Sequence, residues 1–125
     1  MVCYRRRFLK ITITIMSGVE DGNTLEYDSS RGDGQQDQGK WRLSIGRKDE
    51  NDICLKSDTY ISRWHANIIY EAGHWLLEDC KSTNGSFLEN PDDFFNDIPI
   101  QDTVILNTHQ LFRIGKTWLR IETIE

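Results

Sequence analysis

The sequence has few cysteines, and those it has do not form a pattern. Its three cysteines, Cys3, Cys54 and Cys80, are an odd number, and none is spaced like a CxxC metal-binding or redox pair. We therefore expect neither a disulfide framework nor a zinc ribbon. Free thiols in this number are typical of a reducing compartment, so we expect an intracellular protein, nuclear or cytoplasmic.

Long hydrophobic runs are also missing. No apolar stretch approaches the ~18 residues of a transmembrane helix, so we expect no membrane partner. The chain starts with a basic segment, but residues 9–15 alternate between apolar and polar side chains, unlike the unbroken core of a secretory signal. A length of 125 residues fits one domain. We expect that domain at residues 8–125, preceded by a basic N-terminal extension at residues 1–7.

Basic residues are outnumbered by acidic ones, 15 to 20, and are absent from one long stretch. The net charge is −5, and residues 82–112 contain five acids but no Lys or Arg. This balance argues against direct binding of nucleic acid. Residues 40–63 are the exception, with six basic and four acidic side chains. Such a short basic region suits a small anionic ligand better than a long polyanion.

Helical periodicity is missing too, and the dominant period of the hydrophobic pattern is two. Strands are predicted at 9–15, 41–45, 66–70, 74–78, 86–88, 103–106, 110–114 and 117–124, separated by turns such as Asn84-Gly85. Many short strands at this spacing indicate an all-β sandwich or barrel. Trp41, Trp75 and Trp118 lie on these strand patterns, and we expect all three in the core.

Two segments between the predicted strands have distinct compositions. Residues 29–40 contain three glycines and no apolar side chain, which predicts a long mobile loop whose removal changes stability little. Residues 90–97 look like an insertion that offers a second contact surface. Within it, residues 90–95 are compatible with a single helical turn or with a loop.

Signatures of catalysis are not found. No glycine-rich loop follows a predicted strand and opens a helix, and the histidines and cysteines do not have zinc-site spacing. The acids at 89–102 have the composition of a solvated loop rather than of a placed acid–base pair. We therefore expect no enzyme activity, no catalytic residues, no cofactor and no metal site.

Three predicted loops instead contain the residues suited to binding a ligand. They are Gly46-Arg47, then Ser62-Arg63-Trp64-His65, then Ser82-Thr83-Asn84-Gly85. Guanidinium groups match phosphate oxygens with paired donors, hydroxyls add neutral donors, and an Asn amide can bond a peptide backbone. Each residue alone has an ordinary interpretation: Arg47 as a surface arginine, Ser62 as a turn residue, and Asn84-Gly85 as a tight hairpin turn. Taken together, they are suited to holding a phosphate dianion.

This order of motifs resembles the forkhead-associated (FHA) domain family, and the resemblance covers nearly the whole chain. It implies a sandwich of about eleven mostly antiparallel strands whose loops at one end bind phosphothreonine peptides. One departure is the turn at 107–110, where family members often have Gly-Asp. The resemblance implies that the partner is a phosphothreonine-containing protein and that the chain is a recruiting module. Because one binding domain accounts for nearly the whole chain, we expect it to be a fragment of a larger signalling protein.

The resemblance also implies a role for each site residue. Arg47 contacts the phosphate or the peptide close to it, and Ser62 and Arg63 donate to the phosphate. Thr83 supports the pocket, and Asn84 bonds the peptide main chain. Tyr60 lies where selectivity for the third residue after the phosphothreonine is set. Gly46, His65 and Gly85 shape the loops. The alternative is a structural or assembly domain that binds a partner's β-surface without phosphate.

Overall fold

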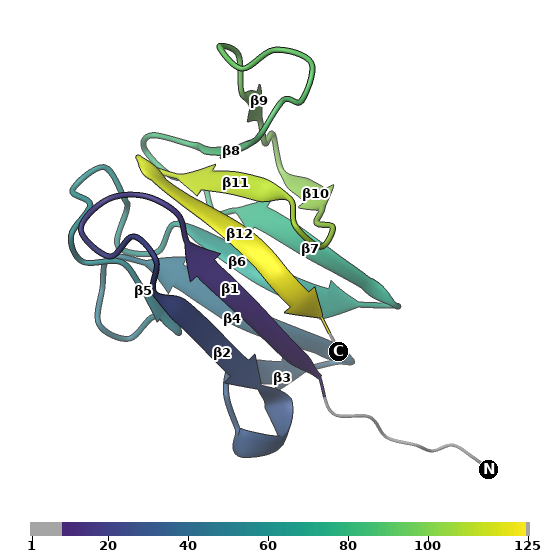
Figure 1. Cartoon of the computed structure of the whole chain (residues 1–125). Helices are drawn as coiled ribbons and strands as arrows, with labels where there is room; N and C mark the ends of the chain where they lie inside the picture. Colours follow the sequence, from purple (N-terminus) through teal and green to yellow (C-terminus); the bar gives the residue numbers. More distant parts are fainter. Residues whose placement is uncertain (1–8, 125) are drawn as a thin grey trace.

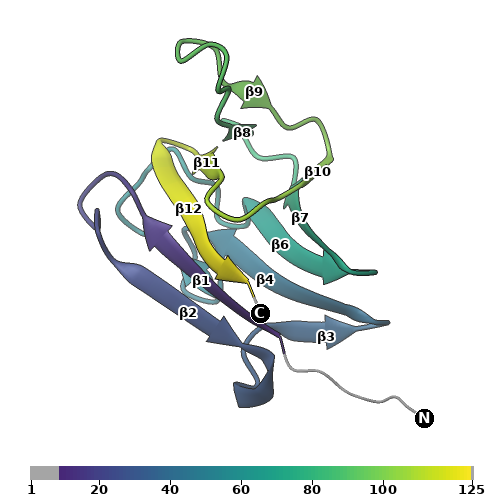
Figure 2. The same cartoon turned by 45° about the vertical axis from the view of Figure 1, so that its right-hand side comes forward.

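Alternating apolar residues form strands that bury one face. In β1 (Lys10–Ile15) the side chains of Ile11, Ile13 and Ile15 are buried, and the residues between them are partly exposed. In β4 (Lys40–Gly46) Trp41 and Leu43 are buried in the same alternation. The computed structural model, which describes residues 9–124, packs two sheets of such strands face to face (Figures 1 and 2).

The first sheet has the strand order β2-β1-β12-β11-β8-β9. Its pairs are antiparallel, and its other strands are β2 (Thr24–Asp28), β8 (Ser86–Leu88), β9 (Ile98–Pro99), β11 (Leu111–Ile114) and β12 (Thr117–Ile124). The second sheet has the order β10-β7-β6-β4-β3, with β5 added in parallel to β4. It contains β3 (Gln35–Asp37), β5 (Ile53–Cys54), β6 (Ala66–Glu71), β7 (His74–Asp79) and β10 (Thr103–Ile105).

The core between the sheets confirms the predicted all-β sandwich. Its largest side chains with almost no exposed surface come from both sheets and include Trp41, Phe112, Leu43, Ile68, Leu77 and Ile114. The described residues form twelve strands, one more than the eleven expected. The predicted N-terminal extension, residues 1–7, lies outside the described residues. No helix among the described residues is long and apolar enough to cross a bilayer.

The prediction that Trp118 lies in the core is wrong. Thr117, Leu119 and Ile121 are the residues of β12 that point inward, so Trp118 points to the opposite face of the sheet and is only half-buried. The sequence did not reveal this because an aromatic residue is compatible with the alternating pattern on either face of a strand. Trp41 and Trp75 are buried as predicted and pack edge to face, with ring centroids 5.7 Å apart.

The prediction of an unstructured loop at residues 29–40 is also wrong. A 3-10 helix spans Ser29–Arg31, and β3 pairs with the start of β4. Asp28 caps the helix by accepting a hydrogen bond from the Ser30 amide at 2.8 Å. The buried Trp41 indole donates to the Asp33 carbonyl at 2.7 Å. These contacts are polar and backbone-based, so the lack of apolar residues did not predict them.

The other two predicted irregular segments are turns. Residues 90–96 form two successive turns rather than a helical turn, since Asp93 N donates to Asn90 O and Asn96 N donates to Asp93 O. The turn at 107–110 is present, closed by a bond of 3.2 Å from Gln110 N to Asn107 O.

Candidate functional site

The three motif loops meet at one end of the sandwich. Backbone hydrogen bonds join them directly: Arg47 N donates to Ser62 O at 3.1 Å, and Cys80 N donates to His65 O at 2.9 Å. A third bond runs from the Thr83 amide to the Ser62 hydroxyl oxygen at 3.2 Å. The structure therefore brings together the loop residues that the sequence analysis singled out, although they span about forty residues of sequence.

Arg47 follows the end of β4 and is exposed. Its Nε donates to the Ile61 carbonyl at 3.0 Å, which fixes the direction of the guanidinium. Its two terminal Nη groups make no hydrogen bond to any described residue. The side chain is therefore held in place through one donor and keeps its paired donors for a ligand.

Ser62 is oriented from both sides. Its hydroxyl oxygen accepts from Thr83 N, as described above, and its own amide donates to His65 Nδ1 at 3.0 Å. The O–H of Ser62 donates to no described residue, so it stays available as a donor to a ligand. Thr83 reaches Ser62 through its backbone, and its side chain is exposed.

His65 connects two of the loops from beneath. The side chain is fully buried; Nδ1 accepts from Ser62 N, and Nε2 lies 2.9 Å from the Gly85 carbonyl oxygen. This arrangement requires the neutral tautomer with the proton on Nε2, which donates to Gly85. Burial lowers the pKa of His65, against the opposing effects of the Gly85 bond and of Asp79.

Gly46 lies where there is no room for a side chain. A Cβ at this position would collide with the Arg63 carbonyl oxygen and come within 2.6 Å of Asn51 Nδ2. Asn51 is buried and donates from Nδ2 to the carbonyl oxygens of Lys48 and Arg63, at 2.9 and 2.7 Å. The close packing of the Gly46 loop against the Arg63 loop thus requires a glycine at position 46 and the buried side-chain amide of Asn51.

Asn84 and Gly85 form the rim on the other side. Asn84 Nδ2 donates to the Tyr60 carbonyl at 2.9 Å, which leaves its Oδ1 available as an acceptor among the described residues. Gly85 has a φ of 85°, a left-handed conformation that favours glycine. Phe87 also packs closely here, since a Cβ on Gly85 would lie 3.1 Å from its ring.

Asp79, at the end of β7, anchors the loop that contains Thr83 and Asn84. Its Oδ1 accepts from the hydroxyls of Ser82 and Ser86, at 2.6 and 2.7 Å, and its Oδ2 accepts from the Ser82 amide at 3.1 Å. Burial opposes ionisation of Asp79, but these hydrogen bonds outweigh it and lower its pKa. The carboxylate thus holds this loop closed.

Arg63 is exposed, and its guanidinium makes no bond to the described residues. Its backbone is fixed by the bond from Asn51, so the side chain extends from a rigid base. Lys48 lies beside it, 5.7 Å from the centroid of the half-exposed Trp64 ring. Together with Arg47, these residues place three basic side chains at this end of the molecule.

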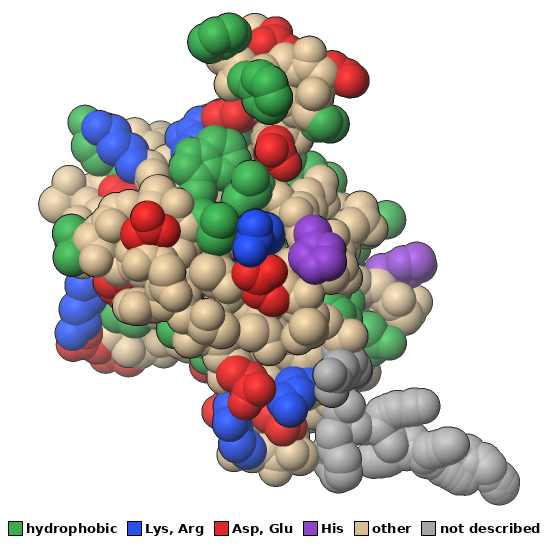
Figure 3. Space-filling model, viewed as in Figure 1, with side chains coloured by type: hydrophobic (Ala, Val, Ile, Leu, Met, Phe, Trp, Pro, Cys, Tyr) green, Lys and Arg blue, Asp and Glu red, His purple; other side chains and the backbone are tan. Residues whose placement is uncertain are grey.

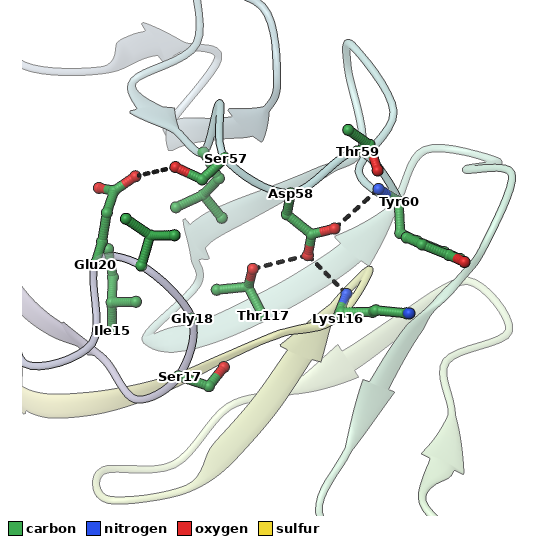
Figure 4. Close-up of a pocket in the computed structure, with 12 residues that line it drawn as sticks. Ile15, Ser17, Gly18, Glu20, Ser57, Asp58, Thr59, Tyr60, Lys116 and Thr117 are labelled. Atoms are coloured by element: carbon green, nitrogen blue, oxygen red, sulfur yellow. Dashed lines mark hydrogen bonds between the residues drawn. The ribbon is translucent and has the colours of Figure 1, made fainter.

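A pocket of about 270 Å³ opens next to these loops (Figure 4). Its wall includes Asp58, which accepts from Tyr60 N, Lys116 N and Thr117 Oγ1 at 2.7–2.8 Å. This carboxylate joins the loop before Ser62 to the turn between β11 and β12. Lys116 lies over the Tyr60 ring, 4.0 Å from its centroid, and Tyr60 is 46% exposed.

The arrangement can bind an anion and an extended backbone, with Arg47, Ser62 and Arg63 as free donors and Asn84 as an amide on the rim. Among residues 9–124 no group of three His, Cys, Asp or Glu side chains is placed to hold a metal ion.

The sequence analysis assigned no role to three residues that build the site. Asn51 bonds loop carbonyls from below, and Asp79 accepts from Ser82 and Ser86. Lys116 comes from a turn over fifty residues away from Tyr60. Asn51 and Asp79 did lie within or beside the motif segments, and that proximity was the only available signal. No sequence spacing indicated Lys116.

Comparison with known proteins gives the same family throughout. The model of the FHA domain matches residues 43–115. The FHA domain-containing protein FhaB of Mycolicibacterium smegmatis is 37% identical over 51 residues, 41% of this chain. That match covers 32% of FhaB, so the similarity spans about a third of this relative's length.

Solved structures show the same fold. The FHA domain of the CT664 protein from Chlamydia trachomatis has a TM-score of 0.67 at 24% identity, covering 91% of this chain and 97% of that one. Mycobacterium tuberculosis EmbR, solved in complex with a low-affinity phosphopeptide, has a TM-score of 0.64 at 22% identity, covering 91% of this chain and 24% of that one. Since the family model spans more than half of the sequence and includes all three motif loops, this chain belongs to the FHA domain family.

Proposed function

We propose that this chain binds phosphothreonine peptides and so recruits phosphorylated partner proteins. The observation that carries the proposal is the pair of free Nη groups on Arg47, whose amide bonds Ser62 O, together with the Ser62 hydroxyl, whose oxygen is held by the Thr83 amide. Both groups are fixed before any ligand arrives, so little side-chain entropy is lost on binding. FHA domains are phosphothreonine-binding modules, and EmbR supports the proposal as a relative solved with a phosphopeptide.

Each remaining site residue has a proposed role. Arg63 is a further phosphate donor, and Thr83 supports the pocket through its bond to Ser62. Asn84 bonds the peptide main chain, in the position set by its contact with Tyr60 O. Gly46, His65 and Gly85 hold the loops in register.

Selectivity beyond the phosphothreonine is assigned to Tyr60. Its half-exposed ring and the Lys116 ammonium stacked on it border the pocket shown in Figure 4. A peptide side chain reaching this corner meets an aromatic face and a positive charge. We therefore propose a preference for an acidic or apolar residue after the phosphothreonine.

The test is a titration of the chain with a degenerate phosphothreonine peptide library and with the same library unphosphorylated. We expect binding only to the phosphorylated peptides. Equal binding of both libraries would favour the alternative, an assembly domain that packs on a partner without reading phosphate. No binding of either library would contradict the proposal as well.

A further inference from the structure

A second concave surface lies on the outer face of the first sheet. It is a groove of about 290 Å³ between that sheet and the loop that follows β8, lined by Met16, Glu89, Asn90, Phe94, Asp97, Leu111 and Trp118. Its floor is the half-buried Trp118 of β12 beside Leu111 of β11. The groove shares no residue with the three motif loops.

The loop that overhangs the groove exposes two adjacent aromatic rings. Phe94 is 82% exposed and Phe95 is 94% exposed, the two largest exposed fractions among the described aromatic side chains. Figure 3 shows hydrophobic side chains on this loop at the top of the view and a further hydrophobic group below it on the same face. An apolar patch of this kind on one face marks an interaction site more often than a chance arrangement.

The loop is braced in this exposed arrangement by its own polar side chains. Asn90 Nδ2 donates to Asn96 O at 3.1 Å, Asn90 Oδ1 accepts from Asp92 N, and Asp93 Oδ1 accepts from Phe95 N at 3.0 Å. The two rings are thus presented to solvent from a shaped turn. Because the loop is already ordered, a binding partner would lose little conformational entropy in fixing it.

Arg113 fastens the loop to the sheet. Its Nη2 lies 3.1 Å from Asp97 Oδ2, its Nη1 donates to Gly115 O at 2.7 Å, and its guanidinium stacks on the Phe87 ring at 4.1 Å. Arg113 is therefore fully engaged. Farther along the same face, Arg120 is paired with Glu122 at 2.8 Å.

The loop over the groove, residues 89–97, carries the acids Glu89, Asp92, Asp93 and Asp97 and no Lys or Arg. The two arginines named above on this face, Arg113 and Arg120, are each paired with an acid. Two copies of this chain, each with a net charge of −5, would bring like charges together if they met through this face. A partner with positive charge on either side of an apolar side chain would match both the groove and its rim.

We propose that this groove is a docking surface for a partner-protein segment that carries an apolar anchor flanked by Lys or Arg. The anchor lies on Trp118 and Leu111 under Phe94, and the flanking cations face Glu89 and Asp92. Binding here needs no phosphate and does not depend on the function proposed for the motif loops. A phosphorylated partner that also carries such a segment would engage both surfaces and gain avidity.

The experiment uses two libraries of short unphosphorylated peptides with a fixed central Phe, Leu or Trp. One has Lys or Arg at the flanking positions, and the other has Asp or Glu at the same positions. We expect the chain to bind the basic library at least about tenfold more tightly than the acidic one, and less tightly as salt rises. The double variant Phe94→Ser/Phe95→Ser and the variant Asp92→Lys lose this preference.

The matched control is Ile105→Ser, which removes a half-exposed apolar side chain from β10, at the edge of the other sheet, and keeps the preference. Arg47→Ala also keeps it, and Phe94→Ser/Phe95→Ser keeps phosphopeptide affinity, so the two proposals fail separately. Equal binding of both libraries, or a preference that survives in the double variant, overturns the inference. A self-association in sedimentation experiments that the double variant abolishes assigns the surface to a second copy instead.

Discussion

Lys40 and Arg47 are basic residues at the two ends of β4, and they differ in whether their charged groups remain free to bind a ligand. Lys40, at the first position of β4, lies 3.7 Å from Glu71. Arg47, just past the other end, is fixed through Nε and offers its Nη pair to solvent. Position relative to the strand end, rather than charge, decides which of them is suited to bind an anion.

Arg47→Ala is expected to cost about 2–4 kcal/mol of phosphopeptide binding, because it removes charge-assisted bonds to a dianion. The side chain is exposed, so the midpoint of thermal unfolding should change little. Calorimetric titration and a melting curve measure the two effects. Lys40→Ala is the control and should bind as the unmodified chain does. A loss of stability as large as the loss of binding would make Arg47 a structural residue.

His65 predicts a pH dependence of stability. Because burial lowers the pKa of His65 in the folded chain, the unfolded chain takes up a proton first as pH falls below about 6.5. The unfolded state then binds more protons, so the free energy of unfolding decreases by at most about 1.4 kcal/mol per pH unit for this group. Chemical denaturation between pH 7.5 and 5.5 measures the slope.

The control for this slope is the exposed residue His74, whose replacement by Gln should leave it unchanged, whereas His65→Gln should reduce it. Should His65→Gln fail to fold, nitrogen NMR of the unmodified chain gives the same answer. The expected spectrum has a neutral His65 ring with its proton on Nε2 at pH 6.5. A protonated ring at that pH would contradict the assignment.

Among the elements, the segment 29–40 illustrates how a polar stretch contributes to the fold. The Trp41 indole is buried, and its N–H is satisfied by the Asp33 carbonyl. Gly34 allows close packing here, since a Cβ on it would lie 2.7 Å from Trp41 Nε1. The structure therefore reverses the expectation that this segment can be removed without effect.

Deletion of residues 30–39 is expected to destabilise the chain by about 1–3 kcal/mol, since it leaves a buried donor without its acceptor. Denaturant unfolding measures the change. Gln36→Ala, an exposed substitution on β3, is the control and should have little effect. A deletion variant as stable as the unmodified chain would show that the segment adds nothing beyond loop closure.

At the scale of the whole molecule, the fold brings basic side chains together beside the motif loops. The motif-loop end carries Arg47, Arg63 and Lys48, whereas residues 82–112 carry only acids among their charged side chains. Binding of a phosphate dianion at the positive end should therefore weaken below pH about 6, where the phosphate takes up its second proton. Titrations from pH 7.5 to 5.5 on folded protein test this, and a flat profile argues against a dianion.

Selectivity for phosphothreonine over phosphoserine depends on one methyl group of the ligand. Burial of a methyl is worth about 0.8 kcal/mol, and the β-branch also restricts χ1 so that the phosphate is aimed in advance. We expect about 1–2 kcal/mol, or about 5- to 30-fold in affinity. Two peptides that differ only at this residue measure it. Equal affinities would mean that the loops around Ser62 and Thr83 form no methyl slot.

The intracellular location, nuclear or cytoplasmic, stays a prediction. Cys54 and Cys80 are both free thiols in the structure, and Cys3 lies outside the described residues.

The sequence by itself determined the fold class and the identity of the motif loops. Strands with one buried face require a period of two, which can be read directly from residues 9–15 or 41–45. Gly46, Ser62 and Asn84 could be recognised because each stands in a short motif, and the order of these motifs resembles the FHA domain family. Both signals are carried by short segments of sequence, so they can be read without knowing how the segments pack.

The tertiary structure alone decided how those segments meet. Which face of β12 is buried, and hence that Trp118 lies outside the core, depends on the register with β1 and β11. Lys116 reaches Tyr60 because the turn between β11 and β12 packs against the loop between β5 and β6 of the other sheet. Arg113 of β11 holds Asp97 in the Phe94 loop because β11 and β8 are neighbours in the first sheet. Contacts between residues far apart in sequence leave no local pattern, since their geometry is set by packing of the whole sandwich.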